Sequence, residues 1–309
     1  MIEASVPVVG ILSLGQEPHE IERYEEQFRQ IAAEKEIPLR ETRQLKNQDL
    51  IQWVVNEIQA EAAFAVGVRV LMPEALWTAC PQGCWAAHDS LLPAYRGFAP
   101  LNWSIINGET ETGVTLFKVD GGMDTGDILF QQRVQIGPDE TAPQVYEKLC
   151  AATVTAVLEG FYLLKNNQAR PRPQEHSLAT YTCSRTPADS MIDWHQSTSS
   201  IHNLIRALTF PYPGAFTYHK NKKLFICSAA PVSSPRFVGR IPGRVIQLDQ
   251  AGWVDVLTGD GVLRIFAVSS DGQTRQDAAG IIRSVRARLG IDWSEAMAAI
   301  QQRHPASNP

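Results

Sequence analysis

Two short segments of this sequence carry side chains that could exchange a proton. The apolar run from Cys84 to Ala87 has the character of a buried strand and is followed directly by His88. A second segment, residues 120–126, is a loop rich in glycine and aspartate that includes Asp124. Histidine exchanges protons near neutral pH, and a carboxylate can fix its tautomer and raise its basicity. We therefore expect an acid–base pair, which by itself does not identify a substrate.

The elements around these segments alternate between strand-like and helix-like patterns over the first 165 residues. Short apolar runs predict strands, and apolar residues at helical spacing separate them. The strand candidates are Val8–Leu14, Ala62–Val68, Cys84–Ala87, Val114–Val119 and Ile128–Ile136. A long helix is predicted from Pro143 to Leu164. This alternation predicts an α/β domain with a doubly wound, mostly parallel sheet, which binds ligands at the carboxyl ends of its strands.

The second half of the chain has a different pattern. Residues 166–177 contain two Arg-Pro pairs and few apolar residues, as expected of a connector. A helix candidate at Ser199–Leu208 follows, and residues 215–270 then contain only short strand-like runs. Short strands at this spacing predict a small β-barrel or sandwich, and we expect a barrel of OB-like type. We expect a catalytic domain at 1–185, a connecting helical segment at 186–212 and a β-domain with a helical tail at 213–309.

Composition narrows the class of protein. The 309 residues include 28 basic and 33 acidic ones, a formal charge of −5, which argues against a general binder of duplex nucleic acid. No apolar run has the length of about 20 residues that a membrane span needs, and we expect no membrane contact. The five cysteines follow no disulfide pattern, which is typical of a cytoplasmic protein. Cys80 and Cys84 lack a second ligand pair, so we expect a structural role for them and no metal site.

The motifs themselves resemble a known family. HDSLLPAYRGFAPLNW, which begins at His88, and GVTLFKVDGGMDTGDIL, which contains Asp124, together resemble the signature of the 10-formyltetrahydrofolate-dependent formyltransferases. The family includes enzymes that act on methionyl-tRNA, on glycinamide ribonucleotide and on sugar nucleotides. Residues 186–216 are most similar to the formyltransferase domain that modifies UDP-4-amino-4-deoxy-L-arabinose.

The resemblance implies a reaction and a set of residues. An amine attacks the formyl carbon of the folate, and the oxyanion that develops must be stabilised. By this resemblance His88 lies beside the formyl oxygen, and Asp124 pairs with it and helps to remove the amine proton. The folate, 10-formyltetrahydrofolate, is expected to contact mainly backbone groups. The positions that carry over to this pocket are Val70, Leu71, Met72, Asp120, Gly121, Gly122 and Met123.

One position departs from the family pattern. The family has Asn-x-His, whereas this chain has Ala86 two residues before His88. The missing asparagine is a donor to the oxyanion, and loss of one such donor costs about 10²- to 10³-fold in rate. Ser90 and Thr125 are the nearest replacement donors. Three explanations remain open at this point: an engineered inactive variant, a natural enzyme with a replacement donor, or a homologue that has lost the reaction.

The acceptor is predicted less directly. In the sugar-nucleotide relatives an arginine that matches Arg206 approaches the substrate phosphates, and a guanidinium suits that contact. Ser90, Asp189 and Trp194 complete the predicted substrate residues. We expect an aminosugar nucleotide in preference to methionyl-tRNA. A non-catalytic folate-binding protein and a hydrolase that releases formate are the alternatives from other classes. Homodimer formation is left open.

Overall fold

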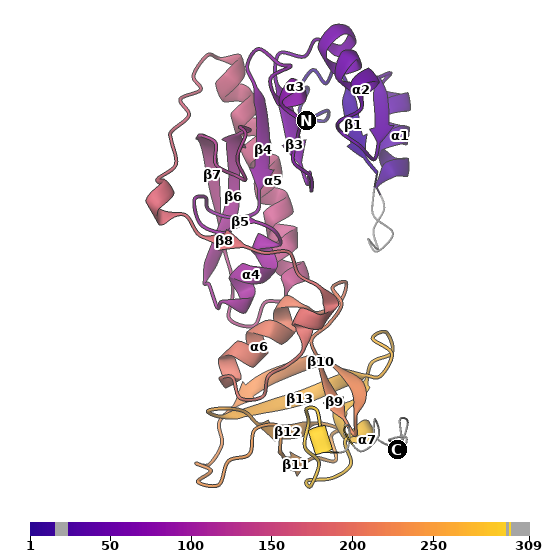
Figure 1. Cartoon of the computed structure of the whole chain (residues 1–309), viewed down its shortest axis with the longest axis vertical. Helices are drawn as coiled ribbons and strands as arrows, with labels where there is room; N and C mark the ends of the chain where they lie inside the picture. Colours follow the sequence, from indigo (N-terminus) through magenta and orange to yellow (C-terminus); the bar gives the residue numbers. More distant parts are fainter. Residues whose placement is uncertain (16–23, 295–296, 298–309) are drawn as a thin grey trace, which may run out of the picture. The chain divides into compact units, whose positions relative to one another are not determined.

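The computed structural model describes residues 1–15, 24–294 and 297 (Figure 1). The chain forms two compact units. The first consists of residues 1–101, 111–135 and 146–184, and the second contains residues 102–110, 136–145 and the chain from Arg185 onward. The segment 186–212, expected as a separate connector, thus groups with the β-rich unit. That unit also takes up two short segments from the first half of the sequence.

The strands of the first unit form three sheets. A four-stranded sheet has the order β3-β4-β6-β7, while β1 pairs with β2 and β5 pairs with β8. In β6, every residue from Thr112 to Phe117 is buried, as expected of a central strand. These strands are β1 (Ile11–Leu14), β2 (Leu39–Thr42), β3 (Ala63–Val66), β4 (Cys84–His88), β5 (Arg96–Gly97), β6 (Glu111–Lys118), β7 (Ile128–Gln135) and β8 (Tyr181–Thr182).

The direction of the strands corrects part of the sequence prediction. β3 and β4 are parallel, as are β1 and β2, but β4–β6 and β6–β7 are antiparallel. Residues 119–127 join β6 to β7 without a helix. Parallel neighbours need a crossover of about a dozen residues or more, so this loop can only return the chain antiparallel. The sheet that carries the candidate site is therefore mixed rather than mostly parallel.

Helix α5 covers one face of this sheet. It extends from Ala142 to Lys165, close to the predicted bounds, and its inward face includes Leu149, Ala156 and Val157. Gly160 lets the helix approach β6, because a Cβ atom there would lie 2.1 Å from the side chain of Leu116. The other helices around the first unit are α1 (Glu25–Glu34), α2 (Gln48–Gln52), a π-helical turn (Trp53–Ile58), α3 (Glu74–Trp77), α4 (Pro100–Ile106) and a 3₁₀ turn (His176–Leu178).

The second unit is built on an antiparallel sheet. Its strand order is β11-β12-β13-β10-β9, with β14 also paired to β13. Helix α6 (Thr198–Ala207) packs against β10 and β13 (Figure 1). The elements of this unit are a 3₁₀ turn (Pro187–Ser190), β9 (Phe216–His219), β10 (Lys222–Val232), β11 (Val245–Leu248), β12 (Val254–Leu257), β13 (Val262–Ser269), β14 (Gln276–Asp277) and α7 (Ala278–Ile281).

Several predictions from the sequence can be compared with this second unit. The β-rich domain is confirmed, whereas its OB-like assignment stays a prediction, because β9 and β11 stand at the two ends of the strand order. Most of the predicted helical tail, residues 295–296 and 298–309, lies outside the described residues. Within the described residues, no helix combines the length and the apolar character that crossing a membrane requires.

Candidate functional site

His88 is the last residue of β4, and a hydrogen bond determines which of its two ring nitrogens carries the proton. The residue is 9% exposed, and its Nε2 lies 2.8 Å from the carbonyl oxygen of Tyr95. A carbonyl oxygen only accepts hydrogen bonds, so Nε2 must carry the proton in this contact. In the neutral ring Nδ1 then keeps its lone pair. His88 can accept a proton only at Nδ1.

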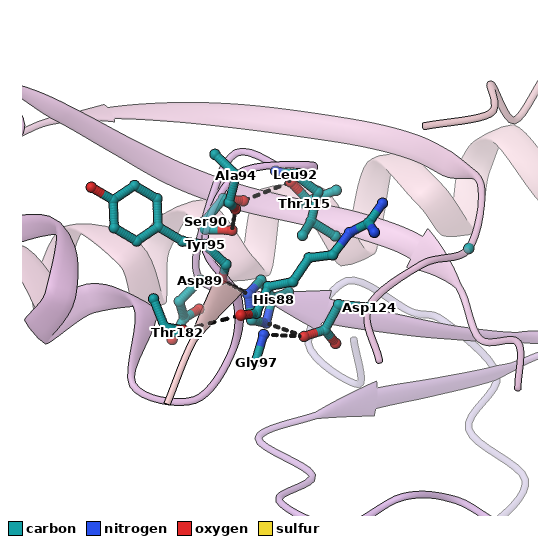
Figure 2. Close-up of polar contacts among 12 residues, drawn as sticks. His88, Asp89, Ser90, Leu92, Ala94, Tyr95, Gly97, Thr115, Asp124 and Thr182 are labelled. Carbon is teal, nitrogen blue, oxygen red and sulfur yellow. Dashed lines mark hydrogen bonds and ion pairs between the residues drawn. The ribbon is translucent and has the colours of Figure 1, made fainter. Parts of the chain in front are cut away.

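Asp124 faces that second nitrogen. Its Oδ2 lies 3.7 Å from Nδ1 of His88, which is beyond direct hydrogen-bond distance, and the side chains point toward each other (Figure 2). The backbone N–H of Gly97 donates to the same oxygen at 2.7 Å. Asp124 has a φ of +54°, in the left-handed region that few side chains adopt. The structure thus brings His88 and Asp124 together as expected.

The tripeptide Tyr95-Arg96-Gly97 binds both His88 and Asp124. Tyr95 accepts from His88, Gly97 donates to Asp124, and Arg96 lies between them in β5. Gly97 has a φ of +105°, and a Cβ atom there would lie 2.5 Å from the carbonyl oxygen of Thr182 in β8. No larger residue fits this crossing. These residues belong to the motif that begins at His88, and their position shortly after the histidine is the sequence signal for a role at the site.

Ala86 stands on the same face of β4 as His88. Across the antiparallel pair, Ala86 lies opposite Phe117 and His88 lies opposite Thr115, which agrees with strand alternation. Ala86 packs against a small buried cluster of Leu92, Phe117 and Ile128. The side chain beside His88 on this face is therefore apolar, and no amide comes from position 86.

Neither replacement donor suggested by the sequence is available in this structure. The Ser90 hydroxyl is 1% exposed and donates to the carbonyl oxygen of Ala94 at 2.6 Å. The Thr125 hydroxyl donates to Oδ1 of Asp120 at 2.6 Å. Both hydroxyl protons are thus engaged in hydrogen bonds to neighbouring residues and are not directed at a substrate oxyanion.

The positions expected to contact a folate form two exposed segments. Val70 and Leu71, in the irregular chain between β3 and α3, are 49% and 71% exposed, whereas Met72 packs against the core. Residues 120–123 are exposed, and Met123 lies beside Gly97: its Sδ would be 3.3 Å from a Cβ atom there. Exposed apolar side chains with accessible backbone suit a planar, partly apolar ligand.

The electrostatic surroundings of His88 include a second carboxyl. Burial raises the pKa of Asp89, and the neighbouring His88 lowers it by a smaller amount. Burial likewise raises the pKa of Cys84 to about 12, and the nearby Cys80 adds to this, so the Cys84 thiol is protonated at neutral pH. No group of three or more potential metal-ligating side chains was found among the described residues.

Comparison with known families now decides the relationship. The N-terminal model described as formyl transferase matches residues 3–159, and the model of the formyl transferase C-terminal domain matches residues 185–286. The chain belongs to the formyltransferase family. The boundary between the two matches agrees with the boundary between the two compact units near residue 185.

Solved structures of several proteins are similar to this chain. HypX from Aquifex aeolicus, in complex with tetrahydrofolic acid, matches 89% of this chain and 46% of its own, with a TM-score of 0.60 and 19% identity. This chain thus spans about half the length of HypX. WlaRD, a sugar 3N-formyltransferase solved with dTDP and 5-N-formyl-THF, matches 83% of this chain and 86% of its own (TM-score 0.60, 20% identity). Methionyl-tRNA formyltransferase from Clostridium thermocellum matches 81% and 100% (TM-score 0.51, 23% identity).

Two of the predicted substrate residues, Trp194 and Asp189, have structural partners within the second unit. Trp194 is 3% exposed and donates from its indole nitrogen to Thr217, as a core residue does. Asp189 accepts from the backbone N–H and the hydroxyl of Thr186, two bonds that lower its pKa and cap the 3₁₀ turn. Both residues belong to the second unit, whereas His88 belongs to the first, so a substrate role for them remains a prediction.

Arg206 also has structural partners. It is 6% exposed, and its guanidinium donates to Asn203 at 2.9 Å and to the carbonyl oxygens of Glu140 and Gly137 at 2.8 and 3.3 Å. Burial lowers its pKa. These contacts lie within the second unit and explain the arginine without a phosphate, so a substrate role for it remains a prediction.

We expect the Arg206→Met variant to lose stability rather than substrate affinity. Methionine fills similar space but leaves the two carbonyl oxygens without their donor, which should lower the free energy of unfolding by about 2–3 kcal/mol. Urea unfolding measures this loss. A variant of wild-type stability with a raised KM for a phosphorylated acceptor would instead support the phosphate contact.

Proposed function

We propose that this chain transfers the formyl group of 10-formyltetrahydrofolate to an amino group, and that the acceptor is an aminosugar nucleotide. The observation that carries the proposal is the His88–Asp124 pair, in which the nitrogen able to accept a proton faces the carboxylate at 3.7 Å. Family membership supports formyl transfer as the reaction. The bond between the amine nitrogen and the formyl carbon forms, and the bond to the folate nitrogen breaks.

His88 and Asp124 have separate tasks in this proposal. As the amine attacks, its proton can pass to Nδ1 of His88, because Nε2 already donates to Tyr95. The imidazolium that results is stabilised by the adjacent carboxylate, as in other histidine–carboxylate pairs. His88 can then return the proton to the leaving nitrogen. The backbone N–H of Gly97 keeps the carboxylate in place without neutralising it.

The folate supplies the activated formyl carbon. The exposed apolar residues Val70, Leu71 and Met123, with the backbone of residues 120–123, would hold its ring system. Gly97, which has no side chain, lets Met123 lie close to the backbone of β5. This arrangement suits a flat ligand that lies across the carboxyl end of β4.

The proposed acceptor rests on the similarity of this chain to sugar-modifying proteins. Residues 186–216 resemble the sugar-modifying relatives, and WlaRD, which matches most of this chain, is a sugar formyltransferase. The formal charge of −5 gives no general attraction for tRNA. An aminosugar nucleotide is soluble, which agrees with a reaction in the cytoplasm.

The test offers the purified chain 10-formyltetrahydrofolate and a panel of UDP- and dTDP-linked aminosugars, with methionyl-tRNA as a separate arm. Mass spectrometry detects formylated acceptor, and a formate assay detects hydrolysis. Formylated sugar nucleotide is the expected result. Formylated methionyl-tRNA would contradict the acceptor, formate release without an acceptor would point to a hydrolase, and folate binding without turnover would point to a binding protein.

Ala86 provides a second prediction about the same reaction. The Ala86→Asn variant should raise kcat by about 10²-fold with little change in KM, because the amide would meet the oxyanion only in the transition state. Ala86→Leu is the matched control, since leucine has nearly the same size and no donor. A rise in both variants, or in neither, would contradict an oxyanion donor at this position.

A further inference from the structure

Arg96 is a buried cation, and among the described residues its side-chain hydrogen bonds go to an amide, a phenol and an imidazole rather than to a carboxylate. Its residue is 1% exposed, and the guanidinium donates to Oε1 of Gln174 at 2.7 and 3.2 Å. It also donates to the hydroxyl of Tyr181 at 3.0 Å and to Nδ1 of His176 at 3.1 Å. A buried guanidinium is usually paired with a carboxylate. Here the central acceptor is an amide.

The other end of that amide reaches the loop that carries Asp124. Nε2 of Gln174 donates to the carbonyl oxygen of Asp124 at 2.9 Å and to that of Gly126 at 2.7 Å. Gln174 is 4% exposed and comes from the connector after α5, 50 residues beyond Asp124. One side chain therefore joins the fully buried arginine to the backbone of the aspartate.

We propose that Gln174 is a positioning residue for Asp124 and acts through the backbone of its loop. This inference rests on the proposed role of Asp124 in formyl transfer. Gly97 holds the carboxylate of Asp124, and Gln174 holds its carbonyl while the residue has a φ of +54°. Together these contacts keep the carboxylate beside Nδ1 of His88. Without Gln174, the rare backbone conformation would depend on Gly97 alone.

The chemistry explains why the residue is glutamine. Glutamate would be the better partner for the charge of Arg96, but an ionised carboxylate has no proton to donate and a protonated one has a single O–H. Glutamine accepts at one end and donates two hydrogen bonds at the other, which matches its two carbonyl partners. The amide therefore meets a requirement of the Asp124 loop rather than of Arg96.

The same unit contains a natural control. Arg172 donates to Oε1 of Gln131, and Nε2 of Gln131 donates to the carbonyl oxygen of Leu92 and to the hydroxyl of Thr115, both at 2.9 Å. The chemistry is again an arginine, a glutamine and two oxygen acceptors. Nε2 of Gln131 thus donates to Leu92 and Thr115 rather than to the Asp124 loop. Gln131 is half-buried whereas Gln174 is buried, so this set controls for loss of an arginine-bound amide and separates it from loss of the aspartate's position.

The first experiment needs no substrate. The titration of His88 is followed by NMR in the full chain and in the variants Gln174→Leu, Gln174→Glu and Gln131→Leu, with Asp124→Asn as reference. Among the described residues, the carboxylate of Asp124 lies 3.7 Å from Nδ1 of His88, and Asp89 interacts with His88 electrostatically. We expect both Gln174 variants to move the His88 titration toward lower pH, as Asp124→Asn should, because the stabilising carboxylate is displaced. Gln131→Leu should leave the midpoint in place.

The outcome decides the proposal in either direction. A His88 titration that is unchanged in folded Gln174→Glu would overturn it, as would an equal shift in Gln131→Leu. Gln174→Glu retains an acceptor for Arg96, so it serves if Gln174→Leu fails to fold. This readout stands whether or not the chain transfers a formyl group.

The second experiment uses the formyl-transfer assay. Gln174→Glu should lower kcat by about 10²-fold, the scale of a misplacement near 1 Å, with little change in KM. In the Asp124→Asn background the same substitution should lower kcat no further, because it acts through Asp124. Independent, additive losses would show a merely structural role. Absence of formyl transfer by the wild type would contradict the proposed function and leave the NMR result valid.

Discussion

The His88→Ala variant should lose about 10³- to 10⁴-fold in kcat while it still binds folate, the upper range for loss of a general acid–base group. Alanine removes the nitrogen that takes the amine proton and leaves the hydrogen-bond donors of the predicted folate positions, which are backbone groups, unchanged. Steady-state kinetics give kcat, and a thermal-shift titration with the folate gives binding. Added imidazole should restore part of the activity if the space left by the side chain admits it.

His202 is the matched control for this variant. It is 8% exposed, and its Nε2 lies 4.0 Å from Oδ1 of Asp139, so it forms a second histidine–aspartate pair. The two histidines are equally buried, whereas the Asp139 side chain is 83% exposed and that of Asp124 is 20% exposed. Burial lowers its pKa and the nearby Arg206 lowers it further, with Asp139 opposing both. His202→Ala should cost stability and retain kcat. Equal losses of kcat in the two variants would mean that His88 acts through stability alone.

Much of the fold could be predicted because apolar periodicity reports burial. The long helix α5, the helix α6 and the strands of the second unit appear close to their predicted positions. The direction of β6 and β7 was missed, because a buried central strand has the same continuous apolar pattern in parallel and antiparallel sheets. β2 was also missed: Leu39–Thr42 is short and mostly polar, and it is defined by its pairing with β1.

The candidate site residues whose side chains could exchange a proton were predicted from the sequence. Residues that contribute through their position in the fold were missed. His88 and Asp124 are recognisable because their residue types exchange protons. The role of Tyr95 depends on its carbonyl oxygen, which every residue has, so no residue type could reveal it. Gln174 lies in a polar, proline-rich connector that looks like a linker, and its function depends on a fold that returns it to Asp124. For Arg206 the residue type alone leaves two roles open, because a guanidinium suits carbonyl oxygens as well as phosphates.

The Asp124→Asn variant should have the second largest effect, a loss of about 10²- to 10³-fold in kcat, near the middle of the range for acid–base groups. Asparagine has the shape of aspartate and can still accept from the backbone N–H of Gly97, so the loop should stay in place. It lacks the negative charge that stabilises the protonated ring of His88. Its amide can also donate to the lone pair of Nδ1 and so block the atom that must accept the proton.

The pH dependence distinguishes this role from a loss of structure. Removing a carboxylate beside His88 disfavours the protonated ring, so the limb of the kcat–pH profile that reports His88 should move to lower pH. Asp139→Asn, beside His202, removes the same charge from the other histidine–aspartate pair and should leave that limb in place. A wild-type profile in Asp124→Asn would show that the carboxylate does not act on His88. The 3.7 Å separation would then reflect the packing of the loop against Gly97 rather than proton transfer.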